Sequence, residues 1–150
     1  MKLYRIILIL IISMIPFSSD GHKYKGNIEL MMNPAKSNLE ITTSHGCLFN
    51  NALYLGIGAG LSAYMHSVEP VDLDVSMYVP IYMKTLYYCN SYESVKPFLG
   101  LESGYYVSGN ECLEFVSPQL GVEFRRLSVL MKCDFFRIGN SLRVGIGINF

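Results

Sequence analysis

The strongest constraint on this chain is an alternation, with a period of two, between apolar residues and small or polar ones. From Leu53 to Met65 every odd-numbered residue is apolar, and the even-numbered residues are only Gly, Ser and Tyr. From Leu142 to Phe150 the even-numbered residues are apolar, and the odd-numbered ones are Arg, Gly and Asn. Successive side chains of a β-strand point to opposite faces, whereas a helix would scatter both sets around its axis. The alternation therefore predicts strands with one hydrocarbon face each.

Turn-forming residues divide the chain into about eight such strands. The predicted strands span residues 24–33, 38–48, 53–65, 73–88, 96–107, 112–124, 127–136 and 142–150. Short segments that contain Asn, Gly, Pro or Ser separate them, and these residues favour turns. Most of the strands reach the 9–11 residues that a tilted strand needs to cross a bilayer. The alternation is poorest in 38–48.

The first 21 residues have the composition of a signal peptide. Lys2 and Arg5 form a basic start, residues 6–17 are largely apolar, and small residues follow. The apolar stretch is shorter than the roughly 20 residues of a membrane-spanning helix, so cleavage is favoured over an uncleaved anchor. We therefore predict export, with a single mature domain over residues 22–150.

Composition narrows the class of protein. Hydrophobic residues make up 51% of the chain and charged residues only 16%, which is more apolar than an ordinary soluble domain. Lys plus Arg equals Asp plus Glu at 12 each, and no basic cluster is present. Because nucleic-acid binding depends on such a cluster, a nucleic-acid partner is not expected.

The second face of the predicted strands combines Gly, Ser and Tyr with charged residues of both signs. The charged residues expected on this face are Lys25, Glu29, Lys84, Glu102, Glu123, Lys132, Asp134 and Arg143. Eight strands enclose an interior just wide enough to be filled by side chains, and opposite charges can pair there. A spanning sheet must also close, because open edges would leave backbone groups unsatisfied in hydrocarbon. We predict an all-β, closed, antiparallel up-and-down transmembrane barrel with this polar network in its lumen.

Aromatic residues near the strand ends fit the girdles that flank the apolar band of such barrels. The residues expected in the girdles are Tyr24, Phe49, Tyr87, Tyr88, Phe98, Phe124, Phe135 and Phe136. The alternative is that they are core aromatics of a soluble sandwich. A soluble barrel would place charge outside and apolar residues within, the reverse of the arrangement predicted here.

Several short motifs follow one another in the mature chain. They are Tyr24-Lys25-Gly26, Thr43-Ser44-His45-Gly46, the run from Leu55 to Gly60, Val79-Pro80-Ile81-Tyr82, Lys96-Pro97-Phe98, Gly104-Tyr105, the run from Ser117 to Val122, and the closing Gly147-Ile148-Asn149-Phe150. In this order they resemble the small outer-membrane β-barrel domain family of Gram-negative bacteria. The resemblance implies an outer-membrane location, surrounding outer-membrane lipid and no defined activity. It also implies that the barrel assembly machinery recognises Phe150 during insertion.

Histidines beside hydroxyl residues suggest a rival function, because some small outer-membrane barrels act on lipid A with such residues. His45 follows Ser44, and His66 precedes Ser67 in a segment that we expect to open an outward-facing loop. Neighbouring side chains diverge on a strand, so we assign no catalytic residue and no cofactor. His22 is expected in the tail of the leader.

The four cysteines raise the question of disulfides, since an exported protein can form them. Cys47 and Cys89 are expected near the periplasmic rim, Cys112 near the outer rim and Cys133 on the lipid face. Free thiols are therefore favoured. No spacing of Cys and His is typical of a metal site.

The leading hypothesis is a non-enzymatic integral outer-membrane barrel, expected to be a monomer. Its lumen is plugged and its role is structural or lies in surface interaction. Two alternatives stay open: a lipid-modifying outer-membrane barrel enzyme and a soluble periplasmic ligand-binding barrel.

Overall fold

The computed structural model describes residues 22–35, 37–68, 72–89, 94–109, 111–137 and 139–150. The predicted signal peptide, residues 1–21, lies outside these ranges. Within them, no helix is long and apolar enough to cross a membrane. The domain is all-β.

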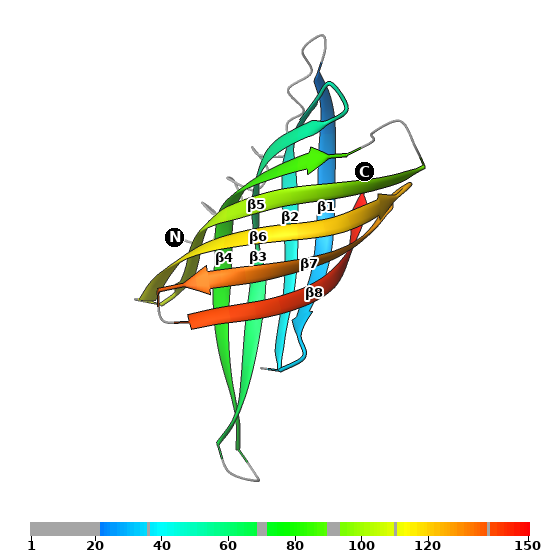
Figure 1. Cartoon of the computed structure of the whole chain (residues 1–150). Helices are drawn as coiled ribbons and strands as arrows, with labels where there is room; N and C mark the ends of the chain where they lie inside the picture. The colour runs from blue at the N-terminus through cyan, green and yellow to red at the C-terminus, as the bar shows by residue number, and fades with distance from the viewer. Residues whose placement is uncertain (1–21, 36, 69–71, 90–93, 110, 138) are drawn as a thin grey trace.

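Eight antiparallel strands form one closed barrel (Figure 1). The strands are β1 (His22–Asn33), β2 (Asn38–Phe49), β3 (Leu53–Val68), β4 (Asp72–Tyr88), β5 (Val95–Ser108), β6 (Glu111–Phe124), β7 (Leu127–Phe136) and β8 (Gly139–Asn149). Each strand pairs with its neighbours in sequence, and β1 also pairs with β8. The predicted up-and-down barrel is confirmed.

The predicted strand ends agree with the observed ones to within three residues. The strand with the poorest alternation, β2, is regular, with unbroken ladders to both β1 and β3. The prediction that His66 and Ser67 open a loop is wrong, because β3 continues to Val68 and His66 pairs with Asp74 of β4. His22 begins β1 and is not part of a separate leader tail.

The seam that closes the barrel lies between β1 and β8. Its ladder runs from the pair Asn27 and Asn149 to the pair Met32 and Val144. Two further backbone hydrogen bonds extend it: Gly26 N–H donates to Phe150 O at 2.8 Å, and Phe150 N–H donates to Gly26 O at 2.9 Å. The last residue of the chain therefore takes part in barrel closure.

The two faces of every strand differ in chemistry. Outward side chains are largely aliphatic and exposed, such as Met83 at 68% and Val129 at 65%. Inward side chains include ionisable ones that are almost fully buried, such as Lys84 at 1% and Arg143 at 0%. The barrel is apolar outside and polar within, as the alternation predicts.

Two apolar clusters occupy the interior at different heights. The first, on the side of the chain termini, contains Met31, Tyr54, Leu86, Tyr88, Phe98 and Leu130. The second, on the side of the turns that follow β1, β3, β5 and β7, contains Tyr82, Tyr106 and Phe115, against which Tyr78, Leu113 and Phe136 pack. Charged interior residues are therefore bounded by aromatic side chains.

Three residues predicted for the outer girdles lie inside the barrel. Tyr88 and Phe98 are 3% and 4% exposed in the first cluster, and Phe136 packs against the second. These three residues occupy positions whose side chains point inward by the alternation of their strands. The alternation therefore outweighs the general preference of aromatic residues for the membrane interfaces. Tyr87, at 57% exposure, shows the outward phase at the neighbouring position.

Glycines in β3 make room for the large interior side chains. A Cβ atom on Gly58 would lie 2.4 Å from the ring of Tyr82, and one on Gly56 would lie 2.3 Å from the hydroxyl of Tyr54. Both distances are far below van der Waals contact. The glycines allow these tyrosines to lie against the wall.

The hairpin of β3 and β4 extends beyond the rest of the barrel (Figure 1). The ladder between β2 and β3 ends at the pair Asn38 and Tyr64, and that between β4 and β5 ends at Val79 and Val107. Residues 66–68 and 72–74 therefore pair only with each other. This extension lies on the side opposite the chain termini.

Candidate functional site

Seven ionisable side chains form a continuous chain through the barrel interior, called here the charge chain. Their order is Glu29, Lys84, Glu102, Lys132, Glu40, Arg143, Asp134, so that the signs alternate strictly. Lys84 and Lys132 each lie 3.0 Å from a carboxylate oxygen of Glu102, and Lys132 lies 3.2 Å from Glu40. Six of the eight strands, all except β3 and β6, contribute residues to the charge chain, and Ser117 of β6 hydrogen-bonds to it. Ion pairing compensates the burial of these charges.

Uncharged polar groups complete the charge chain at one end. Tyr106 donates to Glu40 at 2.7 Å, and Ser117 donates to Asp134. Arg143 contacts both of these carboxylates and the hydroxyl of Tyr106. The guanidinium fork thus bridges two carboxylates, a geometry that a lysine could not reproduce.

A separate pair, Lys25 and Glu123, lies nearer the chain termini. Tyr88 donates a hydrogen bond to Glu123 at 3.1 Å and accepts one from Lys25 at 2.7 Å. The ammonium of Lys25 also lies 4.3 Å from the centre of the Tyr88 ring. This pair is partly shielded from water, with side chains 12% and 7% exposed.

The structure places all eight residues of the predicted polar network in the interior: six in the charge chain, and Lys25 and Glu123 as the separate pair. Sequence reasoning missed Glu40, which is 1% exposed and contacts both Lys132 and Arg143. Glu40 lies between Leu39 and Ile41 in β2, and because successive side chains alternate, it faces the interior if those two apolar residues face outward. Thr43 and His45 blurred this signal because they are polar residues on the outward face.

An aromatic and polar cluster lies on the outer wall beside the seam. The hydroxyl of Tyr24 lies 2.5 Å from Nδ1 of His45, and Nε2 of His45 lies 3.1 Å from Oγ1 of Thr43. Thr43 donates its own proton to the Asn27 carbonyl, so it accepts from Nε2–H of His45. The rings of His45 and Phe150 lie edge to face, with their centroids 6.0 Å apart.

The geometry does not bring His45 together with Ser44. Ser44 points into the barrel, where it accepts a hydrogen bond from Tyr54 at 3.3 Å, and His45 points outward. The side chain of His66, the other histidine considered for catalysis, lies outside the described part of the structure. Nothing in the described arrangement pairs a histidine with a serine nucleophile.

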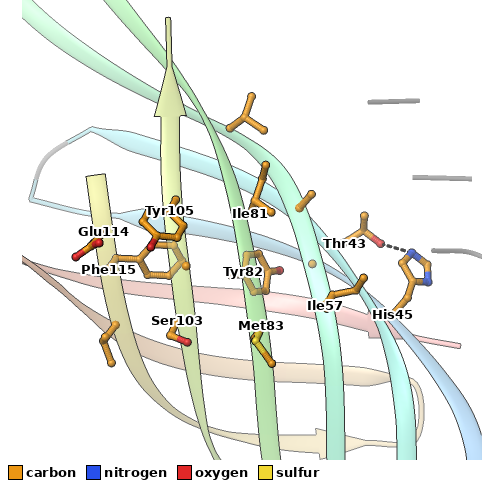
Figure 2. Close-up of a pocket in the computed structure, with 15 residues that line it drawn as sticks. Thr43, His45, Ile57, Ile81, Tyr82, Met83, Ser103, Tyr105, Glu114 and Phe115 are labelled. Atoms are coloured by element: carbon orange, nitrogen blue, oxygen red, sulfur yellow. Dashed lines mark hydrogen bonds between the residues drawn. The ribbon is translucent and has the colours of Figure 1, made fainter. Parts of the chain in front are cut away.

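A shallow hollow of about 680 Å³ crosses the outer wall from β2 to β6 (Figure 2). Ile57, Ile81, Met83 and Tyr105 form much of its apolar lining, and its polar groups include His45 and Glu114 on opposite sides of the view. A hollow with this lining fits a hydrocarbon chain better than a polar ligand.

The structure keeps the four cysteines apart as free thiols, all of them within the described residues. Among those residues no group of three or more His, Cys, Asp or Glu side chains could hold a metal ion.

Comparison with known proteins bears on the fold alone. No protein-family profile and no curated protein sequence matches the chain, so the resemblance to the outer-membrane family stays a prediction. A solved structure described as "De novo design of transmembrane beta-barrels" matches with a TM-score of 0.53 and 10% sequence identity, over 89% of this chain and 98% of that one. The chain therefore shares the closed eight-stranded antiparallel architecture of a designed transmembrane barrel.

Proposed function

We propose that the protein is an integral outer-membrane β-barrel with a plugged lumen and a structural or surface-interaction role. The observation that carries this proposal is the apolar outer wall around an interior of paired charges. Exposed aliphatic residues occur on all eight strands, for example Ile28, Ile57, Leu99 and Ile146, each at least 45% exposed. In water so large an apolar surface would be costly, whereas lipid would cover it favourably.

The interior supports a plugged lumen. The charge chain links side chains across the barrel, and an aromatic cluster lies on each side of it. An ion entering this space would have to displace buried, mutually paired groups such as Arg143 and Glu40, which are 0% and 1% exposed. We therefore expect no general porin conductance.

Location and export follow from the same proposal. The predicted signal peptide would deliver the chain to the barrel assembly machinery, for which the terminal Phe150 would be the recognised residue. With an even number of strands both termini lie on the periplasmic side. The β3–β4 extension would then project from the outer surface and is the segment best placed to meet a surface partner.

Membrane fractionation followed by SDS gels with and without boiling tests the proposal. We expect recovery in the outer-membrane fraction and a faster-migrating band in the unboiled sample, because a closed barrel keeps its fold in SDS. Recovery as a soluble periplasmic protein would overturn the proposal and support a ligand-binding barrel. Planar-bilayer recordings of the purified protein should show no regular conductance steps.

A lipid-modifying activity is the competing function. A deletion strain with altered lipid A, restored by the wild-type chain and not by a His45→Ala or His66→Ala variant, would replace the structural role by an enzymatic one. Unchanged lipid A is the result expected here.

A further inference from the structure

The β3–β4 extension leaves a long strand edge open on β4 (Figure 1). The ladder between β4 and β5 ends at the pair Val79 and Val107, whereas the ladder between β4 and β3 continues seven residues further. Residues 72–78 of β4 therefore pair with β3 on one side, and none of the described residues pairs with them on the other. The opposite edge, on β3, is shorter, because Met65 N–H still donates to Ser37 O at 3.2 Å.

The direction of the backbone groups on the β4 edge follows from hydrogen bonds at the other end of the strand. Tyr88 N–H donates to Ala52 O on the side of β3 at 2.7 Å, and Cys89 N–H donates to Pro97 O of β5 at 2.8 Å. These directions alternate along an antiparallel strand, so odd-numbered residues face the side of β5. The residues that direct N–H and C=O groups to the open edge are Leu73, Val75 and Met77.

Much of the open edge lies beyond the part of the barrel that lipid would cover. This step rests on the proposed function, which places the outer wall in a membrane. β3 and β4 are the longest strands, with 16 and 17 residues, whereas a tilted strand crosses a bilayer in 9–11 residues. Counted from Tyr87 on the side of the chain termini, 11 residues end at Met77. Val75 and the residues before it are therefore outside the bilayer, in water.

The extension is preorganised as a two-stranded ribbon with an apolar outward face. The rings of Tyr64 and Tyr78 meet edge to face, with their centroids 5.5 Å apart. Met65 pairs directly with Val75, and both are exposed together with Met77. A strand that one neighbour holds extended, and whose other edge is open, is a template to which a further strand can add.

The charge of the extension favours a basic partner. Between Lys36 and Lys84 the sequence contains no Lys or Arg, and the acidic residues closest in sequence to the open edge are Glu69, Asp72 and Asp74. A second copy of the chain is disfavoured as the occupant, because identical acidic segments repel each other. Two copies in one membrane would also project their extensions in the same direction, so their β4 edges would meet parallel and not antiparallel.

We propose that the open edge of β4 binds an extended segment of a partner protein by β-strand addition, and that this segment alternates apolar with basic residues. The segment would run antiparallel to β4 and pair with the backbone of Leu73, Val75 and Met77. Its apolar side chains would continue the outward face that Val75 and Met77 begin, and its basic residues would be attracted by the acidic residues of the extension. The surface-interaction role is thereby assigned to one strand edge.

Peptide binding to the purified full chain in detergent micelles tests the proposal. The probe is a seven-residue peptide in which Val and Lys alternate, and binding is followed by backbone amide hydrogen exchange in NMR spectra. We expect exchange at Leu73, Val75 and Met77 to slow by about tenfold once the peptide is at ten times its dissociation constant. Exchange at Asp74 and Ser76 should change little, because their N–H groups face β3.

Two control peptides separate backbone pairing from charge. In the first, N-methyl groups on the Val residues keep the side chains but remove the N–H groups that would face β4, so this peptide should slow exchange at none of the three residues. In the second, Glu replaces Lys, and like-charge repulsion should weaken its binding by at least about tenfold. Equal binding of the basic and acidic peptides would overturn the assignment of a basic partner.

Variants of the chain locate the edge. Val75→Pro removes one N–H group from the open edge, and proline is tolerated on an edge strand where the missing N–H group faced solvent. The unboiled gel band should be retained, whereas the affinity for the Val and Lys peptide should fall by at least about fivefold. Val75→Thr, which keeps the N–H group, is the matched control and should bind the peptide as the wild-type chain does.

Unchanged exchange at Leu73, Val75 and Met77 with saturating peptide would overturn the proposal, as would peptide-induced protection confined to other residues. Protection that appears without peptide and increases with protein concentration would assign the edge to a second copy instead. Recovery as a soluble protein would contradict the proposed function, whereas loss of peptide binding in a chain recovered from the outer membrane would contradict only the assignment of the β4 edge.

Discussion

The inward and outward faces of β8 show how one strand serves two environments. Arg143 points inward, is 0% exposed and contacts two carboxylates, whereas its neighbours Leu142 and Val144 point outward and are 51% and 39% exposed. In a soluble protein the charge would be outside and the aliphatic residues within. The comparison teaches that the interior of this barrel is held by directional polar contacts, and that its outer wall depends on the medium around it.

The largest expected effect comes from removing a charge from the interior, where directional polar contacts hold the barrel. Arg143→Met should lower the free energy of unfolding by ~3–5 kcal/mol, because it leaves Glu40 and Asp134 facing each other without their shared cation. Urea titration followed by gel mobility measures the change. Arg143→Lys, which keeps the charge but loses the planar fork, should cost less. An unchanged midpoint for Arg143→Met would mean that the carboxylates are not ionised.

Adding a charge to the outer wall tests whether lipid or water surrounds that wall. Met83→Arg places a guanidinium at a 68% exposed position in the middle of the wall. In a bilayer it should cost ~2–4 kcal/mol, as charged residues do at the lipid face of barrels. In water the same change should stay within about 0.5 kcal/mol. Folding titrations into lipid vesicles decide between these outcomes, with Arg125→Met in the β6–β7 turn as the control for a charged residue outside the wall.

The seam offers a smaller effect, which depends on shape and not on charge. A Cβ atom on Gly26 would lie 2.4 Å from the ring of Phe150, so Gly26→Val should displace the ring and cost ~1–3 kcal/mol. Unfolding midpoints measured for Gly26→Val, Phe150→Leu and the double variant give the coupling between the two positions. Strictly additive losses would show that the ring does not press on Gly26.

The smallest expected effect concerns the polar cluster on the outer wall. His45→Leu removes the hydrogen bonds to Tyr24 and Thr43 and should cost ~0.5–1.5 kcal/mol. Thr43→Val removes only one of them and should cost less. If His45→Leu instead stabilised the protein in vesicles, the apolar demand of the medium would outweigh both hydrogen bonds.

Much of this arrangement could be predicted from the sequence, because the side-chain period of a strand is a local property. The phase of each strand assigns its residues to a face, and eight charged residues of the inward face follow from it. Glu40 was missed because Thr43 and His45 blur the phase of β2, although their polar groups are satisfied beside the seam by residues distant in sequence.

The sequence by itself determined the strand count, the order of the turns and the chemistry of the two faces, all of which depend on neighbours along the chain. Only the tertiary structure decided that Glu40 joins Lys132 to Arg143, that Tyr88 and Phe98 turn inward, and that Gly147 faces Glu29 and Ser128. These contacts depend on the register between strands and on barrel closure. Closure brings residues more than a hundred positions apart to hydrogen-bonding distance, as between Asn27 and Asn149.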